Sequence, residues 1–451
     1  MTAPTVSLWN DTVPESVTPR PALDGDTVVD VAIIGAGLTG IWTAYYLQKR
    51  DPGLRIALLD KNVAGFGASG RNGGWASALF PQTTSALVSK YGFDAAKGLR
   101  DAMVDSIGEI GRVIEAEHID CDFARVGTLI YARTPLQEKM LRAEVAETQN
   151  LGIDALDWVD AAQVHAAGAR GATFTHDCAR IHPAKLVTGM ARTVEQRGAT
   201  IYEHTTVESW SSGRVVTDRG VVTARHIVNA TEGYGASIAQ THRRILPLYS
   251  LMIATAPLPD SVWDEIGLQH GHTFSDGRNL IIYGQRTADN RFAFGGRGAR
   301  YHLGSAIKPE YDQSAAVFGH LERTLSEMFP QAGTLEVTHR WGGPLGVPRD
   351  WHAHVAYDHE SGIGSAGGYV GDGLTTTNLA GRTLADLITR TDSHLTRLPW
   401  VGHHSPDWEL EPLRFIGANM GLIGMTAADA EENATGSPSI IAKLLAPLTG
   451  H

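Results

Sequence analysis

The feature that most constrains the fold is a glycine-rich stretch near the N-terminus, "GAGLTGIWTAYYLQKRDPGLRIALLD", at residues 35–60. It follows the β-branched run "VVDVAIIG", which is typical of a strand buried on both faces of a parallel sheet. Apolar residues at helical spacing come next, Pro52 and Gly53 end the expected helix, and "LRIALLD" predicts a second strand. The stretch therefore predicts a βαβ unit within an α/β domain.

The three glycines of this stretch have the GxGxxG spacing of a dinucleotide site. Gly35 is expected to form the turn, Gly37 to let a pyrophosphate approach the backbone, and Gly40 to pack the helix on the strand. The free N–H groups at the start of that helix favour an anion. Asp60 follows Gly40 by 20 residues, at a strand end where its carboxylate can accept hydrogen bonds from ribose hydroxyls. This combination predicts a bound dinucleotide rather than a glycine-rich turn without a ligand.

Composition excludes several other classes of protein. The net charge of −11 and the absence of a basic run oppose binding to nucleic acid. Cys121 and Cys178 are the two cysteines and form no CxxC motif, and the 19 histidines show no ligand spacing, so we expect neither a disulfide framework nor a metal site. Without a signal-peptide pattern or a run of about 18 apolar residues, the chain is expected to be cytoplasmic, without a membrane span.

A second glycine-rich segment, "AGFGASGRNGG", follows Asp60 and suits a loop around a large anionic ligand. With it, the sequence resembles the D-amino-acid oxidase family of FAD enzymes, which includes glycine oxidase, sarcosine oxidase and the gamma-glutamylputrescine oxidases. "SGRNGG" is the pattern of the last branch. The resemblance extends over nearly the whole chain, through "RIHPAKLVTGMARTVEQRGATIYEHTTV", "IVNATEGYG", "RWGGPLG", "GGYVGDGLTTT" and "VGHHSPDWELEPLRFIG".

The resemblance implies an α/β (α+β) fold, with a Rossmann-like FAD-binding domain of glutathione-reductase type and an inserted antiparallel-sheet substrate domain. A chain of 451 residues is also longer than one core usually supports. The expected divisions are an N-terminal irregular arm at 1–26, an FAD-binding domain at 27–84, 172–244 and 341–395, a substrate-binding domain at 85–171 and 245–340, and a C-terminal tail at 396–451 that packs on the core and ends in a helix near "SIIAKLL".

The resemblance also implies a set of FAD-binding residues: Gly35, Gly37, Leu38, Thr39, Gly40, Asp60, Lys61, Ser69, Gly70, Arg71, Asn72, Gly73, Gly74, Val207, Ala230, Thr231, Gly233, Gly371, Gly373, Leu374, Thr375 and Thr376. The turn at 368–376 would present N–H groups to the flavin's pyrimidine edge. Family members with a covalent flavin carry a cysteine just after the region matching "RWGGPLGVPRD", where this chain has none. We therefore expect non-covalent FAD.

Five residues are candidates for the substrate side, each with a structural alternative. Arg297, after two glycines at a strand end, could bind a carboxylate or form an interdomain ion pair. Tyr249 could orient an amine or carboxylate or be a core tyrosine. Trp341 and Trp75 could wall an apolar slot or simply pack. Asp372 could meet a substrate ammonium or cap a helix.

The predicted reaction is oxidation of a C–H bond next to nitrogen, with hydride transfer to flavin N5 and hydrolysis of the resulting imine. O2 or another acceptor would reoxidise the flavin; family members that react rapidly with oxygen often carry a lysine on the strand that here reads "RFAFGGRG" and has Arg291 and Ala293. The expected partners are a small-molecule amine or amino acid and the electron acceptor, with the chain as a monomer or homo-oligomer. The alternatives are an FAD-carrying subunit of a heteromeric amine dehydrogenase and a flavin oxidase of an alcohol or sugar.

Overall fold

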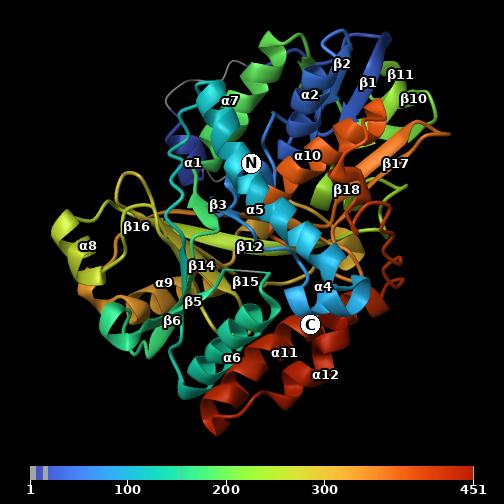
Figure 1. Ribbon diagram of the computed structural model, residues 1–451. Coiled ribbons are helices and arrows are strands. Elements are labelled where there is room, and N and C mark those ends of the chain that lie inside the picture. The colour runs from blue at the N-terminus through green and yellow to red at the C-terminus, as the bar shows by residue number, and fades with distance from the viewer. Residues whose placement is uncertain (1–6, 14–18, 154, 450–451) are drawn as a thin grey trace.

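Two large sheets form the molecule, and the computed structural model describes residues 7–13, 19–153 and 155–449 of it (Figure 1). The first sheet has the order β17-β18-β11-β1-β2-β8, with β9 and β10 as an antiparallel extension of β11. Its strands are β1 (Thr27–Ile34), β2 (Ile56–Leu59), β8 (Thr200–Tyr202), β9 (Val207–Ser211), β10 (Arg214–Thr217), β11 (Gly220–Asn229), β17 (His354–Asp358) and β18 (Ile363–Gly367).

The predicted βαβ unit lies at the centre of this sheet. Strand β1 pairs in parallel with β2 and with β11, which comes from the middle of the chain. Helix α2 (Leu38–Arg50) connects β1 to β2 and packs beside α10 (Gly373–Thr389). Side chains from one face of β1 and β2, such as Ile33 and Leu58, lie in one apolar core with residues of both helices and of α7 (Pro183–Gln196). Segments from the beginning, middle and end of the chain thus build one nucleotide-binding type of domain.

The second sheet has the order β16-β12-β15-β14-β13-β4-β6-β5 and is antiparallel except where β13 pairs with β4. Its strands are β4 (Thr128–Tyr131), β5 (Asp157–Asp160), β6 (Gly171–Thr175), β12 (Leu246–Thr255), β13 (Thr273–Asp276), β14 (Ile282–Arg286), β15 (Phe292–Ala299) and β16 (Val337–Val347). Helix α9 (Ala315–Met328) packs on β12 and β15 over a second apolar core. Helices α6 (Pro135–Leu151) and α8 (Asp260–Ile266) lie at its outer parts (Figure 1).

Residues 85–171 divide between the two cores. Helix α5 (Phe93–Ala116) contributes Leu99, Met103 and Ile107 to the core of the first sheet and packs on α10. Helix α4 (Thr84–Tyr91) precedes it, whereas β4 to β6 belong to the second sheet. The domain boundaries remain a prediction, and this packing favours a boundary after α5 in place of residue 84.

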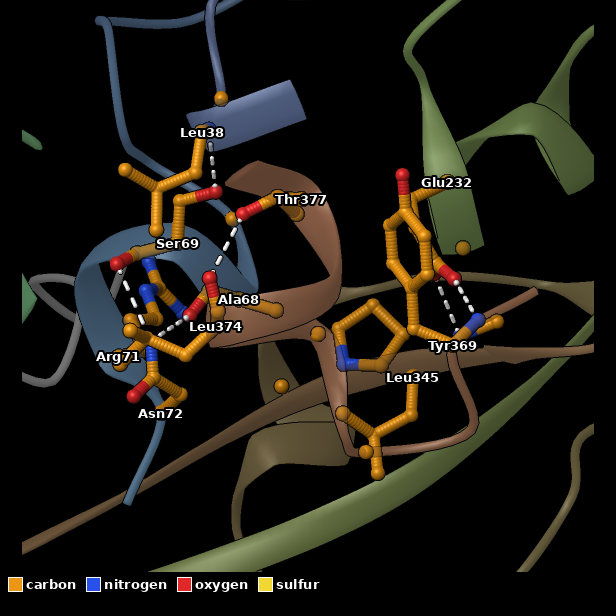
Figure 2. A pocket seen from close by; sticks show the side chains of 18 of the residues that line it. Leu38, Ala68, Ser69, Arg71, Asn72, Glu232, Leu345, Tyr369, Leu374 and Thr377 are labelled. Atoms are coloured by element: carbon orange, nitrogen blue, oxygen red, sulfur yellow. Dashed lines mark hydrogen bonds between the residues drawn. The ribbon is translucent and has the colours of Figure 1, made fainter. Parts of the chain in front are cut away.

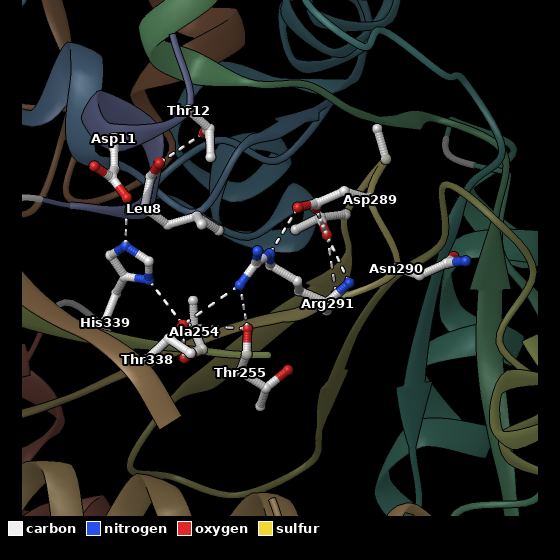
Figure 3. A network of polar contacts seen from close by, with 12 residues as sticks. Leu8, Asp11, Thr12, Ala254, Thr255, Asp289, Asn290, Arg291, Thr338 and His339 are labelled. Carbon is white, nitrogen blue, oxygen red and sulfur yellow. Dashed lines mark hydrogen bonds and ion pairs between the residues drawn. The ribbon is translucent and has the colours of Figure 1, made fainter. Parts of the chain in front are cut away.

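The composition of residues 1–26 predicts an irregular arm, and this prediction is wrong at Leu8–Asp11, which form helix α1. Residues 1–6 and 14–18 of the predicted arm lie outside the described residues. Ser7 caps the helix, and Leu8 and Trp9 are buried against Trp341 and its neighbours. Figure 3 shows His339 on β16 beside the Asp11 carboxylate, at 3.2 Å. Apolar burial of two side chains therefore orders a segment whose Pro and Thr content suggests a loop.

The C-terminal tail contains more helix than its sequence suggests. Besides α12 (Ile440–Thr449), which matches the expected final helix, it forms α11 (Leu413–Thr435). Three glycines within α11 weaken the helical pattern, and tertiary contacts compensate: the Asp429 carboxylate accepts hydrogen bonds from the backbone N–H groups of Asn279 and Leu280. No helix in the described parts of the chain is long and apolar enough to cross a membrane.

Candidate active site

A cavity of about 570 Å³ lies where the carboxyl ends of β1 and β2 face the second sheet (Figure 2). Most of the predicted site residues line it: Gly35, Gly37, Leu38, Thr39, Asp60, Lys61, Ser69, Arg71, Asn72, Gly73, Trp75, Val207, Ala230, Thr231, Gly233, Arg297, Gly371, Asp372, Gly373 and Leu374. Seven others do not: Gly40, Gly70, Gly74, Tyr249, Trp341, Thr375 and Thr376. The structure thus brings together residues separated by more than 300 positions in the sequence.

The turn from β1 into α2 is closely packed where the glycines occur. Gly35 has φ +105°, and a Cβ there would lie 2.7 Å from the carbonyl oxygen of Ala230. A Cβ on Gly37 would lie 2.9 Å from the Ser69 Oγ, which accepts a hydrogen bond of 2.8 Å from the Leu38 N–H. Side chains at these two positions would collide with the Ala230 backbone and the Ser69 hydroxyl, so the close packing of this turn requires glycine.

Asp60 is held at the end of β2 by two backbone donors. Its carboxylate accepts hydrogen bonds from the N–H of Ala36 at 2.9 Å and of Asn62 at 2.8 Å. Burial raises the pKa of this carboxyl, and the two backbone donors oppose that shift. The acidic side chain is therefore fixed on the cavity wall, as a ribose site requires.

The loop at residues 69–74, which begins within the short helix α3 (Ala68–Arg71), is fastened by side chains from distant parts of the chain. Trp9 donates its indole N–H to the Asn72 carbonyl at 2.8 Å, and Trp341 donates to the Arg71 carbonyl at 2.9 Å. The Arg71 guanidinium forms an ion pair of 2.9 Å with Asp312. Trp341 is thus outside the cavity and positions the loop behind its wall.

A glutamate that sequence reasoning did not single out organises the opposite side of the cavity. Glu232 is the residue between two predicted ligands and has φ +45°. Its Oε1 accepts hydrogen bonds from Gly368 and Tyr369, both at 3.1 Å, and its Oε2 from Gly346 at 2.7 Å (Figure 2). Its carboxylate thereby joins β16 to the turn that leads into α10. The available sequence signal for this role was an acidic residue, Glu232, within the glycine-containing segment "NATEGYG".

Arg297 and Asp372 supply opposite charges to the cavity. The Arg297 guanidinium donates to the Val370 carbonyl at 2.8 Å and lies 5.4 Å from the ring centre of Trp351. Burial lowers the pKa of Arg297 and raises that of Asp372 to about 6, and their mutual attraction opposes both shifts. Asp372 precedes α10, but its side chain makes no capping hydrogen bond. Its carboxylate is thus available to the cavity.

The other two substrate candidates lie on different sheets: Tyr249 on β12 of the second sheet, and Trp75 on β3 (Trp75–Ser77), which pairs with β7 (Cys178–Arg180) in a separate two-stranded sheet. Tyr249 on β12 points away from the cavity, into the core, where its ring meets His302 and Tyr311. Its neighbour Ser250 lines the cavity and makes a 2.7 Å hydrogen bond with the Tyr283 hydroxyl. Trp75 also lines the cavity. Because residues alternate across a strand, the sequence identified the correct strand but not the face of it.

These features suit FAD. Gly35 and Gly37 line the cavity at the start of α2, Asp60 lines it at the end of β2, where the sequence predicts a ribose, and the cavity continues past the 69–74 loop to the N-terminus of α10. A Cβ on Gly73 would lie 2.7 Å from the Tyr283 ring, so this part of the wall also depends on glycine. Fold and cavity together define an enzyme that uses a dinucleotide cofactor.

Comparisons with known proteins identify the family. The model of the FAD dependent oxidoreductase family (DAO) matches residues 30–387, so the chain belongs to that family. The predicted family, fold class and FAD cofactor are confirmed. It is 29% identical over 380 residues to the gamma-glutamylputrescine oxidoreductase of Escherichia coli, covering 82% of this chain and 86% of the relative.

More distant relatives agree with this assignment. The sarcosine oxidase subunit beta of Rhodobacter capsulatus is 23% identical, covering 81% of this chain and 86% of that protein. The crystal structure of glycine oxidase from Geobacillus kaustophilus superposes with a TM-score of 0.70 at 21% identity, covering 83% of this chain and 99% of that one. The shared architecture therefore includes both sheets.

Proposed function

We propose that this FAD enzyme oxidises a carbon–nitrogen bond of an amine that also carries a carboxylate. The observation that carries the proposal is the pair Arg297 and Asp372, a cation and an anion that line the same buried cavity. A substrate with a carboxylate and an ammonium complements both. The names of the relatives, gamma-glutamylputrescine oxidoreductase and glycine oxidase, support this class of substrate.

Each residue of this pair has a defined task in the proposal. The Arg297 fork binds the carboxylate, and the Asp372 carboxylate accepts a hydrogen bond from the substrate nitrogen. Since its pKa of about 6 lies near neutrality, Asp372 can take the proton that the ammonium must lose before oxidation. Bound FAD would supply the hydride acceptor.

The FAD would be held without a covalent bond. Cys121 and Cys178 are both free and buried, and neither lines the cavity. Burial raises the pKa of each thiol to about 12, which opposes formation of a reactive thiolate. Two free thiols also support the cytoplasmic location proposed for the chain.

The test is anaerobic mixing of the FAD-loaded protein with amines that do and do not carry a carboxylate. Bleaching of the yellow flavin band is expected for carboxylate-bearing amines. Arg297→Gln should raise KM for these at least tenfold and leave neutral amines nearly unchanged, whereas the control Arg300→Gln, at an exposed position on the chain, should change neither. Equal loss for both substrate groups would make Arg297 structural.

One observation favours a second candidate, an FAD-carrying subunit of a heteromeric dehydrogenase. Sarcosine oxidase subunits beta are among the relatives. In that case no amine would bleach the flavin of the isolated chain. Rapid mixing of the reduced protein with oxygenated buffer distinguishes an oxidase from a dehydrogenase. We expect slow reoxidation of the flavin, because the chain has Arg291 and Ala293 on the strand where rapidly reacting family members often carry lysine.

A further inference from the structure

Helix α11 exposes an apolar stripe that the described residues leave uncovered. Leu413, Ile416, Met420 and Ile423 have exposed fractions of 64%, 47%, 56% and 66%. Their spacings of three, four and three residues place them on one side of the helix, in the pattern that pairs helices. In Figure 1 this helix and α12 lie at the lower edge of the molecule, below the second sheet.

The other side of α11 is attached to its own chain. Arg414, Gly421 and Ala428 are buried, and the Asn419 amide exchanges hydrogen bonds with the backbone of Tyr301. Helix α12 covers a third side, where the Leu445 side chain packs on Gly424. Helix α11 is therefore firmly attached to the fold, and the stripe lies on the side that faces away from the molecule.

The stripe is also free of charge. No charged residue occurs between Arg414 and Asp429. The acids that follow are engaged elsewhere: Asp429 and Glu432 bind Asn279, and Glu431 accepts hydrogen bonds from Ser439 and Ile441. Like charges would thus not oppose contact between two copies of this surface.

We propose that the stripe pairs with the same stripe of a second copy of this chain, with the two α11 helices antiparallel about a two-fold axis at Met420. Positions equidistant from Met420 combine large with small residues: Leu413 faces Ala427, Ile423 faces Gly417, and Ile416 faces Gly424, over which the Leu445 side chain of α12 lies. Among the described residues, a Cβ on Gly417 would meet nothing within 4 Å, which leaves space there for the Ile423 of the second copy. Such self-complementarity is what a two-fold interface requires.

The amount of exposed apolar surface agrees with a dimer. Ile440 and Leu444 on α12 and Leu410 before α11 are exposed as well, at 65%, 75% and 65%. At roughly 100 Å² each, the seven side chains offer on the order of 700 Å² per copy, close to the ~800 Å² per partner of specific interfaces.

The test is the mass of the full-length, FAD-loaded protein by analytical ultracentrifugation at micromolar concentration. We expect twice the chain mass, and at least a tenfold weaker dimer for Met420→Lys. The matched control Thr426→Lys places the same charge on an exposed position of α11 outside the stripe and should leave the dimer intact. The flavin spectrum and melting temperature of each variant verify that it is folded.

The pairing register of the two α11 helices can be tested separately, because the proposed two-fold axis brings Met420 of one copy next to Met420 of the other. Met420→Cys should form a disulfide between two copies under mild oxidation, whereas Thr426→Cys should not; the native thiols are buried. A monomeric wild-type protein would overturn the proposal, as would a dimer that Met420→Lys leaves unchanged. Binding of a monomer to lipid vesicles, lost in Met420→Lys, would instead assign the stripe to a membrane surface and equally overturn it.

Discussion

Gly40 allows helix α2 to pack closely on strand β1, because glycine has no side chain. A Cβ there would lie 2.1 Å from the Gly35 carbonyl oxygen and 3.0 Å from Cγ2 of Ile33. The backbone oxygen cannot move without opening the turn that forms the start of the cavity. This is the close helix–strand packing that the third glycine of the motif predicts, although Gly40 itself does not line the cavity.

We therefore expect Gly40→Ala to weaken FAD binding at least tenfold and to lower stability by about 1–3 kcal/mol, because the added methyl group overpacks the α2–β1 contact. Fluorescence titration of the apoprotein with FAD measures the affinity for FAD, and urea unfolding measures the free energy of unfolding. Gly53→Ala, just beyond the same helix, is the control, since its Cβ would approach only Asp51 Oδ1, at 3.3 Å. Similar effects of both substitutions would contradict this role.

His182 links the stability of the protein to pH. Its Nδ1 accepts a hydrogen bond from the Lys185 N–H, and its Nε2 contacts the Thr12 hydroxyl at 2.9 Å. Burial, with the nearby Lys185 charge, lowers its pKa to about 4. Between the unfolded value near 6.5 and this value, the unfolded chain binds a proton that the folded chain does not, so stability falls as the pH falls.

Urea unfolding at pH 7 and pH 4.5 is expected to show this loss, with about 2 kcal/mol from His182. In His182→Gln the difference between the two pH values should shrink by that amount, because the glutamine does not titrate. The exposed His394, replaced by Gln, should leave the difference unchanged. A full pH effect in His182→Gln would place its origin at other titratable groups.

At the scale of elements, the loop at 69–74 depends on a short helix that comes long before it and a strand that comes long after it. Trp9 on α1 and Trp341 on β16 hold two consecutive carbonyls, and their rings meet edge to face at 6.2 Å. The wall beside the predicted flavin ring is thus braced from behind by residues that do not touch the cavity. We therefore expect α1 to support cofactor binding through this segment.

Trp9→Phe should keep the packing of the ring but lose the hydrogen bond to the Asn72 carbonyl. Since one such bond contributes about 1 kcal/mol, FAD affinity should fall roughly fivefold. Trp158→Phe, on the outer strand β5 where the indole bonds Asp160, is the matched control and should have no effect. Unchanged FAD affinity in Trp9→Phe would mean that the loop holds its shape without α1.

The sequence predicted these elements unequally. The βαβ unit and the glycine-rich 69–74 segment were predictable because glycine spacing and a β-branched run are local signals that their contacts require, but the short helix α3 at Ala68–Arg71 was not predicted. The position of Tyr249 was not, since two adjacent residues of an apolar strand give no sign of which face is the core. The α11 helix was missed because its glycines oppose helix formation locally, and only contacts such as Asn419 with Tyr301 stabilise it.

For the whole molecule, the cavity lies between two separate apolar cores, so a ligand there joins them. FAD at a concentration 100-fold above its Kd should therefore stabilise the apoprotein by about 2.7 kcal/mol. Calorimetry measures this as a rise in melting temperature. FMN lacks the adenylate that Gly35 and Asp60 are predicted to hold and should stabilise far less. An equal rise with FMN would contradict the proposed placement of the adenine end.

The cavity wall also has a consequence for biosynthesis, because it joins residues from Gly35 to Thr377. While the chain is still emerging from the ribosome, the early βαβ unit has neither its neighbouring strand β11 nor the turn before α10. A complete binding site therefore exists only after α10 has been translated. Flavin capture must be a late event in the life of each new chain, and a cell short of flavin would accumulate finished but unloaded protein.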